Sequence, residues 1–246
     1  MTAAQIHGVR ALHTVAGCRE QRALLLEGEH LVREALVMGR LLRVFAAPAM
    51  NALGEACAAA GVAVDFVDDK TLARLVQTRS PQGVCGIVDW RQVVPEDLVA
   101  DRLLVLDGLQ DPGNVGTLLR SAEAAGFGGC LMCGGVSLCN TKLIRASMGS
   151  VLRVPVAQMP GELAGAFLAA QGYQVRVLAL EGQSLFAIKA FPRRLALVVG
   201  SEGAGVSAAF DGLPRLRIPM AGAVESLNAG VAGSLAMLTV AAGEVE

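Results

Sequence analysis

Short apolar runs alternate along the chain with longer stretches in which apolar residues recur every three or four positions. The short runs predict buried strands, and the longer period predicts amphipathic helices. In the first ninety residues the predicted strands are 22–28, 41–48, 62–68 and 83–90, and the predicted helices are 29–40, 52–61 and 70–77. This alternation indicates a small α/β domain at the start of the chain.

The same alternation returns more strongly after residue 101. The predicted strands, the last two of which run on into loops, are 102–109, 130–135, 154–159, 173–180, 195–205 and 215–222. The predicted helices are 114–127, 141–151, 161–172 and 225–243. Such strand–helix alternation predicts an α/β fold with a parallel sheet covered by helices on both faces. Ligands of such sheets bind at the carboxyl ends of the strands.

The stretch QVVPEDLVAD, residues 92–101, interrupts the alternation with a proline and three acidic residues. It is typical of a linker. We therefore predict a domain boundary near Pro95, with domains of residues 1–95 and 96–246, sizes that two modest domains can have.

Composition indicates a folded chain, since 53% of its residues are hydrophobic and 17% are charged. No apolar run approaches the roughly 20 residues of a membrane span. The first ten residues lack the features of a secretory signal, so we expect a cytoplasmic protein with no membrane partner. Six cysteines at 18, 57, 85, 130, 133 and 139 lie in apolar stretches. We expect free buried thiols and no metal, because the single CxxC has no second pair to complete a zinc site.

Charge neither supports nor excludes a nucleic-acid partner. The net charge is −1, and residues 1–95 carry ten basic against nine acidic side chains. Eighteen of the 21 basic residues are arginine, which suits phosphate contacts and stacking on bases, although genome composition can equally produce this bias.

Three loops of the second half carry candidate chemistry. In the first, a strand ends at Asp107 and a helix begins at Asn114, which is a plausible N-cap. Arg120 lies six residues into that helix, where it could reach back toward the loop or be an ordinary surface arginine.

In the second loop, Gly200, Gly203 and Gly205 allow a close backbone approach to a ligand, although a plain strand-to-helix turn would need glycines too. Glu202 argues against a phosphate ligand, because its charge would repel one. The third loop ends at Ser226–Leu227–Asn228, which opens an apolar helix and could simply cap it.

Together, DPGNVGTLLRSAEAAGF, VVGSEGAG and IPMAGAVESLNAGVA resemble the three motifs of the SpoU (TrmH/RlmB-like) family of SPOUT methyltransferases, over residues 102–240. LLLEGEHLVREAL and TRSPQGVCGIV resemble the L30e-like substrate-binding domain that precedes many of these enzymes. The resemblance implies a C-terminal trefoil knot, an S-adenosylmethionine cofactor, and methyl transfer to a ribose 2′-hydroxyl of RNA. It also implies a homodimer packed through the knot, in which one subunit completes the site of the other.

The resemblance also assigns residues. Cofactor contacts would come from Gly200, Ile218, Met220 and Leu227. The catalytic group would comprise Arg120, Asn114, Glu202, Ser226 and Asn228. Because a guanidinium stays protonated, we expect Arg120 to orient the hydroxyl and stabilise developing negative charge rather than act as a base. Our candidates for RNA contacts are Arg22, Arg33, Arg79, Lys142 and Arg145, together with Arg153.

The chain departs from the family pattern after Asn228. The third motif usually continues with Val-Ser or a similar pair, whereas here it continues with Ala229-Gly230. We expect this change to affect helix packing and not the key polar residues.

We expect 23S ribosomal RNA as the substrate because the N-terminal domain is present. A tRNA substrate is the alternative within the same activity. A catalytically silent RNA-binding or assembly factor is a second alternative, against which the intact catalytic group argues, and a nucleotide-binding enzyme without an RNA partner is a third.

Overall fold

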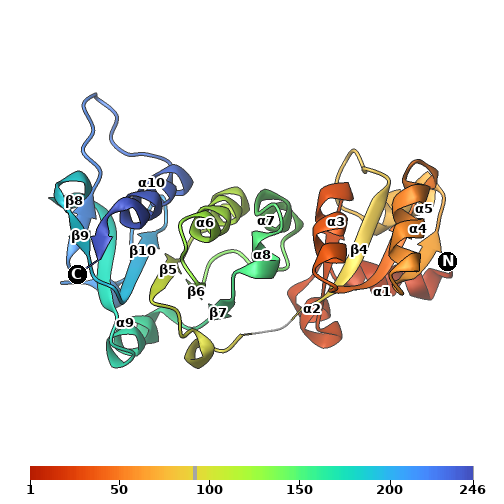
Figure 1. Ribbon diagram of the computed structural model, residues 1–246, viewed down its shortest axis with the longest axis horizontal. Coiled ribbons are helices and arrows are strands. Elements are labelled where there is room, and N and C mark those ends of the chain that lie inside the picture. Colours follow the sequence, from red (N-terminus) through yellow and green to blue (C-terminus); the bar gives the residue numbers. More distant parts are fainter. Residues whose placement is uncertain (91–92, 246) are drawn as a thin grey trace. The chain divides into compact units, whose positions relative to one another are not determined.

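The computed structural model describes residues 1–90 and 93–245, and the chain divides into two compact units (Figure 1). The first unit comprises Met1–Gln92 and Ser137–Gly149, and the second comprises Val93–Val136 and Ser150–Glu246. The predicted linker begins at Gln92, which lies outside the described residues. The predicted division into 1–95 and 96–246 differs from these units, because Ser137–Gly149 groups with the first.

The first unit contains a four-stranded sheet in the order β1-β4-β2-β3. Strand β4 is antiparallel to both neighbours, and β2 is parallel to β3. The strands are β1 (Ala23–Glu27), β2 (Leu41–Ala46), β3 (Ala63–Phe66) and β4 (Val84–Asp89). The helices among them are α3 (Glu29–Val37), α4 (Asn51–Ala59) and α5 (Asp69–Leu75), with a 3-10 turn η1 (Pro48–Met50) before α4. Each predicted element of this region is present.

Two short helices precede the first strand and were not predicted. In α1 (Ala3–Ala11), Thr2 and Gln5 form a capping box, and in α2 (Val15–Gln21) the Thr14 side chain accepts from the Gly17 amide. Gly17 packs so closely on the carbonyl of Ala11 that a Cβ would overlap it. The threonine caps are the sequence signal for these helices, but glycines within both weaken the periodicity.

The predicted helix 141–151 is two helices, α7 (Thr141–Ala146) and α8 (Ser150–Arg153). Between them Met148 and Gly149 have φ of +50° and +91°, a left-handed conformation that ends a helix. Helix α7 packs on β1, with Leu143 and Ile144 buried. It therefore belongs to the first unit although its sequence neighbours belong to the second.

The second unit is built on a six-stranded sheet in the order β11-β8-β10-β5-β6-β7. All its pairings are parallel. The strands are β5 (Arg102–Asp107), β6 (Gly129–Cys133), β7 (Val156–Gln158), β8 (Gln174–Ser184), β10 (Leu195–Gly200) and β11 (Arg215–Arg217). Short strands β9 (Ala190–Phe191) and β12 (Glu244–Val245) pair separately, and the 3-10 turns are η2 (Pro95–Asp97), η3 (Leu185–Ala187) and η4 (Ala208–Phe210).

Helices cover both faces of this sheet. On one face α9 (Gly161–Ala170) buries Leu168 in a core with Val105 and Val198. On the other face α6 (Pro112–Ala124) and α10 (Ala229–Ala242) pack together, and Leu118 of α6 lies near Val199, whose side chain alternates with that of Val198. The predicted fold class, a parallel α/β sheet covered on both sides, is confirmed.

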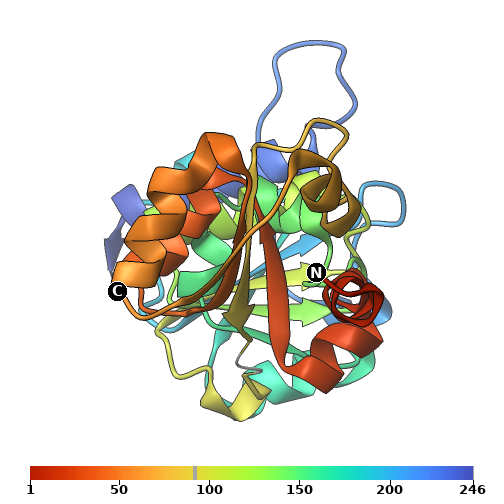
Figure 2. The same ribbon diagram turned by 90° about the vertical axis from the view of Figure 1, so that its right-hand side faces the viewer.

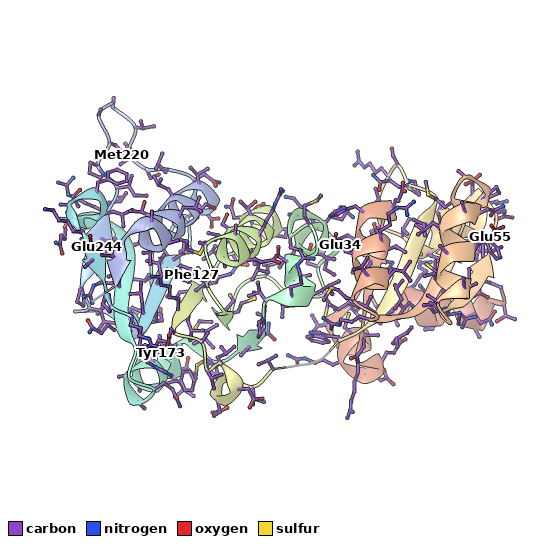
Figure 3. All side chains as sticks on the ribbon, viewed as in Figure 1. Glu34, Glu55, Phe127, Tyr173, Met220 and Glu244 are labelled. Carbon is purple, nitrogen blue, oxygen red and sulfur yellow. The ribbon has the colours of Figure 1, made fainter. Side chains whose placement is uncertain are left out.

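The described part of the predicted linker is a packed segment of the second unit. Leu98 is 3% exposed, and Val93 bridges to Ala157 beside β7. The Tyr173 hydroxyl, labelled in Figure 3, donates to the carbonyl of Ala100 at 2.5 Å. Residues 93–101 therefore pack against the core of the second unit. No helix among the described residues is long and apolar enough to cross a membrane.

Candidate functional site

The candidate site begins where β5 and β10 end side by side. Gly200 at the end of β10 pairs with Asp107 at the end of β5. Because the strands are parallel, the loop that follows Asp107 and the loop that follows Gly200 leave the same edge of the sheet. Two of the three predicted motif loops are thus neighbours.

Helix α6 begins at Pro112, and Asp111 is its N-cap, with its side chain accepting from the Asn114 amide at 2.8 Å. The prediction that Asn114 is the N-cap is therefore wrong. Asn114 lies in the first turn of the helix. Its side chain is free for another contact, and its Nδ2 donates to Oε1 of Glu202 at 2.5 Å. The first and second motifs are joined through these two predicted site residues.

The second motif is a tight loop. Ser201 and Gly205 exchange backbone hydrogen bonds of 2.9 and 3.0 Å, and Gly205 has a φ of +70°. A Cβ on Gly200 would lie 2.4 Å from the carbonyl carbon of Gly205. Glycine at 200 is therefore required for the loop to fold back on its strand. From the loop the chain continues into η4.

Asp107 was predicted only as a strand end, and the structure places it beside Gly200 at the site. Its carboxylate is 5% exposed, and Oδ2 accepts from the Ser207 amide at 2.5 Å. It therefore anchors the chain that leaves the glycine loop. The available signal was an acidic residue at the carboxyl end of the apolar run LLVLD.

The third motif meets the first at the start of α10. Asn228 caps this helix, with Oδ1 accepting from the Val231 amide at 3.2 Å. A Cβ on Gly230 would lie 3.0 Å from Oδ1 of Asn114 and 3.1 Å from Oδ1 of Asn228. The expectation that Gly230 affects only helix packing is wrong, because its nearest neighbours are two predicted catalytic side chains.

Helices α6 and α10 are held together below this point. A Cβ on Gly233 would lie 2.4 Å from the Leu118 side chain, so the helices approach closely there. The hydroxyls of Ser121 and Ser234 are 2.7 Å apart and share a hydrogen bond. This contact fixes the position of Asn228 and Gly230 relative to Asn114.

The rest of the third motif, residues 218–228, is an open loop that projects from the second unit (Figures 1 and 2). Met220, labelled in Figure 3, and Ile218 are half-buried at its base. Leu227 and Val224 are exposed to 36% and 62%, and Ser226 is exposed too. The structure thus gathers Asn114, Glu202 and Asn228, and places Ser226 and the predicted cofactor residue Leu227 on the open loop.

Arg120 lies on an exposed stripe of α6 with Thr117 and Ala124. Six residues after Asn114, it points about 120° away from it around the helix. Arg120 therefore lies on a different side of α6 from the Asn114–Glu202 contact.

Several of the predicted RNA-binding residues have partners within the first unit. Arg145 forms an ion pair with buried Glu27, Nη1 to Oε2 2.9 Å, and its Nη1 also donates to the Thr78 hydroxyl. Arg33 pairs with Glu29 along α3 at 2.7 Å. Arg22, the left-handed cap of α2, is exposed, as are Arg79 and Lys142.

A pocket of about 70 Å³ lies beside the Glu27–Arg145 pair, with Gly28, Ser80 and Gln82 on its other sides. In the second unit, Arg153 makes a bidentate contact to Glu123 at 2.5 and 3.1 Å. The ion pair lowers the pKa of Glu123, because Arg153 stabilises the ionised carboxylate. Arg145 and Arg153 therefore have structural roles before any RNA is bound.

All six cysteines are free and buried. Burial raises the pKa of Cys133 to about 12 and that of Cys130 still further. Both thiols of the CxxC pair are therefore protonated at neutral pH. Thiols in this state pack as small apolar groups.

The residues of the second and third motif loops fit an S-adenosylmethionine molecule. A Cβ on Gly203 would meet nothing within 4 Å, so the backbone of the glycine loop is open to a ligand. The exposed apolar side chains of Val224 and Leu227 offer a surface for a nucleobase. The glycine loop carries the carboxylate of Glu202, whose negative charge suits a positively charged sulfonium and not a phosphate.

Comparison with known proteins identifies both units. The model of the SpoU rRNA Methylase family matches residues 101–238, and the model for RNA 2′-O ribose methyltransferase substrate binding matches residues 25–93. The 23S rRNA (guanosine(2553)-2′-O)-methyltransferase RlmP of Bacillus subtilis is 29% identical over 92% of this chain and 91% of its own length.

Two further proteins are similar over most of their length. An uncharacterized tRNA/rRNA methyltransferase of Synechocystis is 35% identical over 91% of this chain and 85% of its own. The crystal structure of an AdoMet-bound rRNA methyltransferase from Sinorhizobium meliloti has a TM-score of 0.83 and 29% identity, covering 98% of this chain and 95% of that one.

Proposed function

The chain belongs to the SpoU rRNA methylase family and is an S-adenosylmethionine-dependent RNA 2′-O-methyltransferase, and we propose that it methylates a ribose of 23S ribosomal RNA. The observation that supports methyl transfer is that the three motifs meet at one edge of the sheet. Asn114 of the first holds Glu202 of the second, and Gly230 of the third lies against Asn114. In the cytoplasm the enzyme would meet ribosomal RNA as it is made.

The bound S-adenosylmethionine supplies an activated methyl group, so the protein has to position the hydroxyl, exclude water and stabilise charge. Gly200, Ile218, Met220 and Leu227 would hold the cofactor. Asn114 fixes the Glu202 carboxylate through their hydrogen bond. Asn228 starts α10 beside Asn114, so its carboxamide borders the same space.

Arg120 is proposed to orient the 2′-hydroxyl and stabilise the negative charge that develops on its oxygen. Because Arg120 lies about 120° around α6 from Asn114, it would serve the site of a second copy and not its own. We therefore propose a homodimer in which each subunit completes the other's site.

Helix α10 supports such a dimer. It carries no charged residue, and its apolar side chains lie on all sides. Met237 and Val240 are buried inside the unit, whereas Val231 and Leu238 are exposed to 54% and 50%. A helix that is apolar all round is normally covered all round, and a second copy of this chain would cover the outer side.

The first unit is proposed to choose the RNA. It carries the substrate-binding domain, and the exposed Arg79 with the Ser80 and Gln82 side chains at the pocket provides groups for phosphates and base edges. Because the net charge of the chain is −1, we expect few phosphate contacts and a shallow dependence of affinity on salt. The named function of the Bacillus relative supports 23S RNA as the target.

The test is to map 2′-O-methyl groups in 23S RNA, 16S RNA and tRNA from cells with and without the gene, and to repeat the reaction with purified RNA and enzyme. We expect one 23S ribose to lose its methyl group without the gene and to regain it in vitro. If the methyl group that depends on the gene lies in tRNA, the proposed activity stands and the proposed substrate is wrong. Methylation unchanged in all three RNAs, with no transfer in vitro, would instead favour the silent RNA-binding factor.

A further inference from the structure

The Arg145 guanidinium is held on one side and open on the other. Its Nη1 lies 2.9 Å from Oε2 of Glu27, whose side chain is 4% exposed, and donates to the Thr78 hydroxyl at 2.8 Å. Among the described residues, its Nε and Nη2 have no hydrogen-bond partner. The side chain of Arg145 is 38% exposed, so a ligand can reach these donors. The ion pair thus fixes the orientation of a planar fork whose other donors are unused.

The pocket beside this guanidinium combines apolar walls with a second unused polar group. The cavity of about 70 Å³ has the apolar side chains of Val76, Pro81 and Val84 on its walls. The Gln82 carboxamide lies over Gly28, where a Cβ would come 2.4 Å from its Oε1. In the part of the chain that the structure describes, this carboxamide has no hydrogen-bond partner either. Apolar walls with a few oriented polar groups are typical of a small-ligand site.

A nucleobase fits these groups better than a phosphate does. The carboxylate of Glu27 neutralises the charge of Arg145, and it would repel a phosphate placed against the same guanidinium. A base edge is neutral and needs no net positive charge in the pocket. Its ring would contact the apolar walls while its polar edge meets the fork, as in the recognition of unpaired bases in RNA.

Of the four bases, guanine has the edge that matches an arginine fork. Its O6 and N7 are adjacent acceptors, which arginine binds through two parallel hydrogen bonds. Adenine presents a donor beside N7, cytosine presents a donor, and uracil has a single acceptor on this edge. We propose that the pocket reads an unpaired guanine of the RNA, with Arg145 as its specificity-determining residue. This rests on the proposed function, in which the first unit chooses the RNA.

The test measures the affinity of the full chain for single-stranded RNAs of about ten nucleotides by fluorescence anisotropy. Each RNA is oligocytidine with one variable nucleotide at its centre, so the phosphates are the same in all. Guanosine at the centre should give binding at least about fivefold tighter than adenosine, uridine or cytidine. Inosine keeps O6 and N7 and should bind like guanosine, whereas 7-deazaguanosine lacks N7 and should bind more weakly. Equal affinity for all these RNAs would overturn the proposal.

Arg145→Lys tests the fork and keeps a positive charge beside Glu27. Lysine can pair with the carboxylate but has no two parallel donors, so the preference for guanosine should disappear while the Tm changes by only a few degrees. Arg43→Lys is the matched control, because Arg43 is 39% exposed and pairs with Asp65 of the same unit outside the pocket. It should keep the wild-type preference. A preference that survives in Arg145→Lys would overturn the role of Arg145.

Gln82→Ala is a second variant that leaves the Glu27 cluster intact. Gln82 is exposed and lies outside that cluster, so folding should be unaffected. Affinity for the guanosine RNA should fall about threefold or more, and affinity for the all-cytidine RNA should stay unchanged. An equal loss for both RNAs would mean that Gln82 contacts the RNA backbone and would contradict the base pocket.

Failure of this proposal and failure of the proposed function give different results. An enzyme that methylates 23S RNA but binds all the short RNAs equally would have the proposed function without a guanine pocket. A preference for guanosine that depends on Arg145, in an enzyme that methylates no ribose of 23S RNA, would support the pocket and overturn the proposed substrate.

Discussion

Arg145 Nη1 lies 2.9 Å from Oε2 of Glu27, 118 residues earlier in the chain. Glu27 ends the first strand of the N-terminal sheet, and Arg145 is in α7, which follows the first motif and the strand after it. The carboxylate also accepts from the amides of Gln77 and Thr78. This buried cluster explains why α7 belongs to the substrate-binding unit.

The ion pair should contribute much more to stability than the surface pairs do. The Glu27 side chain is 4% exposed, so Glu27→Ala leaves an arginine and two amides without their acceptor and should cost about 3 kcal/mol. Glu29→Ala is the matched control, because Glu29 pairs with Arg33 on the same unit but both are at least 41% exposed. Its cost should be under about 0.5 kcal/mol. Urea unfolding would measure the loss of unfolding free energy in both variants. Equal losses would show that the buried cluster stabilises the unit no more than a surface pair does.

Removing the first unit should leave α7 with an apolar face and no partner. Leu143 and Ile144 are 0% and 1% exposed in the full chain. In the full chain, serine at both positions should destabilise the protein by at least about 3 kcal/mol. In a fragment of residues 93–246 the same two changes should lower binding of an apolar dye and improve solubility.

Calorimetry on that fragment should still detect S-adenosylmethionine binding, since all three motif loops belong to the second unit. Dye binding that is insensitive to the serine substitutions would mean that α7 finds another partner in the fragment. Loss of cofactor binding would mean that the loops need the first unit.

Glycine is needed at one position of the second motif and is less critical at another. A Cβ at Gly200 would lie 2.4 Å from the backbone of Gly205, whereas one at Gly203 would meet nothing within 4 Å. We expect Gly200→Ala to weaken S-adenosylmethionine binding at least about tenfold, because the loop can no longer close on its strand. Gly203→Ala should keep the wild-type Tm. Calorimetry and thermal melting of both variants would check this, and similar cofactor affinity in the two would contradict the role given to Gly200.

Arg120→Ala should abolish methyl transfer and leave cofactor affinity nearly intact, because a guanidinium would repel a sulfonium and is assigned to the RNA. Arg193→Ala is a suitable control, since the Arg193 side chain is 77% exposed and pairs with Asp101 at the surface. If the site is shared between copies, mixing Arg120→Ala with Gly200→Ala subunits should restore measurable activity that neither has alone. No recovery after subunit exchange would place Arg120 in the site of its own chain.

The sequence predicted the alternating elements and the three motifs because both are local patterns. The apolar runs and the glycine loop are visible within about ten residues each. The N-cap of α6 was predicted to be Asn114 and is Asp111. Both are polar residues that can cap a helix, and they lie only about one helical turn apart. The place of α7 was missed because it depends on the contact of Arg145 with Glu27, and no local pattern encodes that. The proximity of Gly230 to Asn114 was missed for the same reason, since the two residues are 116 positions apart in the sequence.

The contact of Arg153 with Glu123 gives a pH dependence whose sign can be worked out. Arg153 lowers the pKa of Glu123 in the folded protein below the unfolded value of about 4.3. The folded state therefore binds fewer protons, so the pair stabilises fully above the unfolded pKa, and this is lost as pH falls through the folded value. Since both side chains are about one third exposed, the contribution should be no more than about 1 kcal/mol.

Glu123→Gln should therefore lower the Tm at pH 7 by a few degrees at most. The difference from wild type should shrink steadily below pH 4, where the wild-type carboxylate becomes protonated as well. Melting curves of the two proteins from pH 7 to pH 3 would measure this, with Glu162→Gln as a control, since Glu162 has no resolved ion pair among the described residues. A difference in Tm that stays constant across this range would mean that the change acts through packing of α6 on α8 and not through the charge of Glu123.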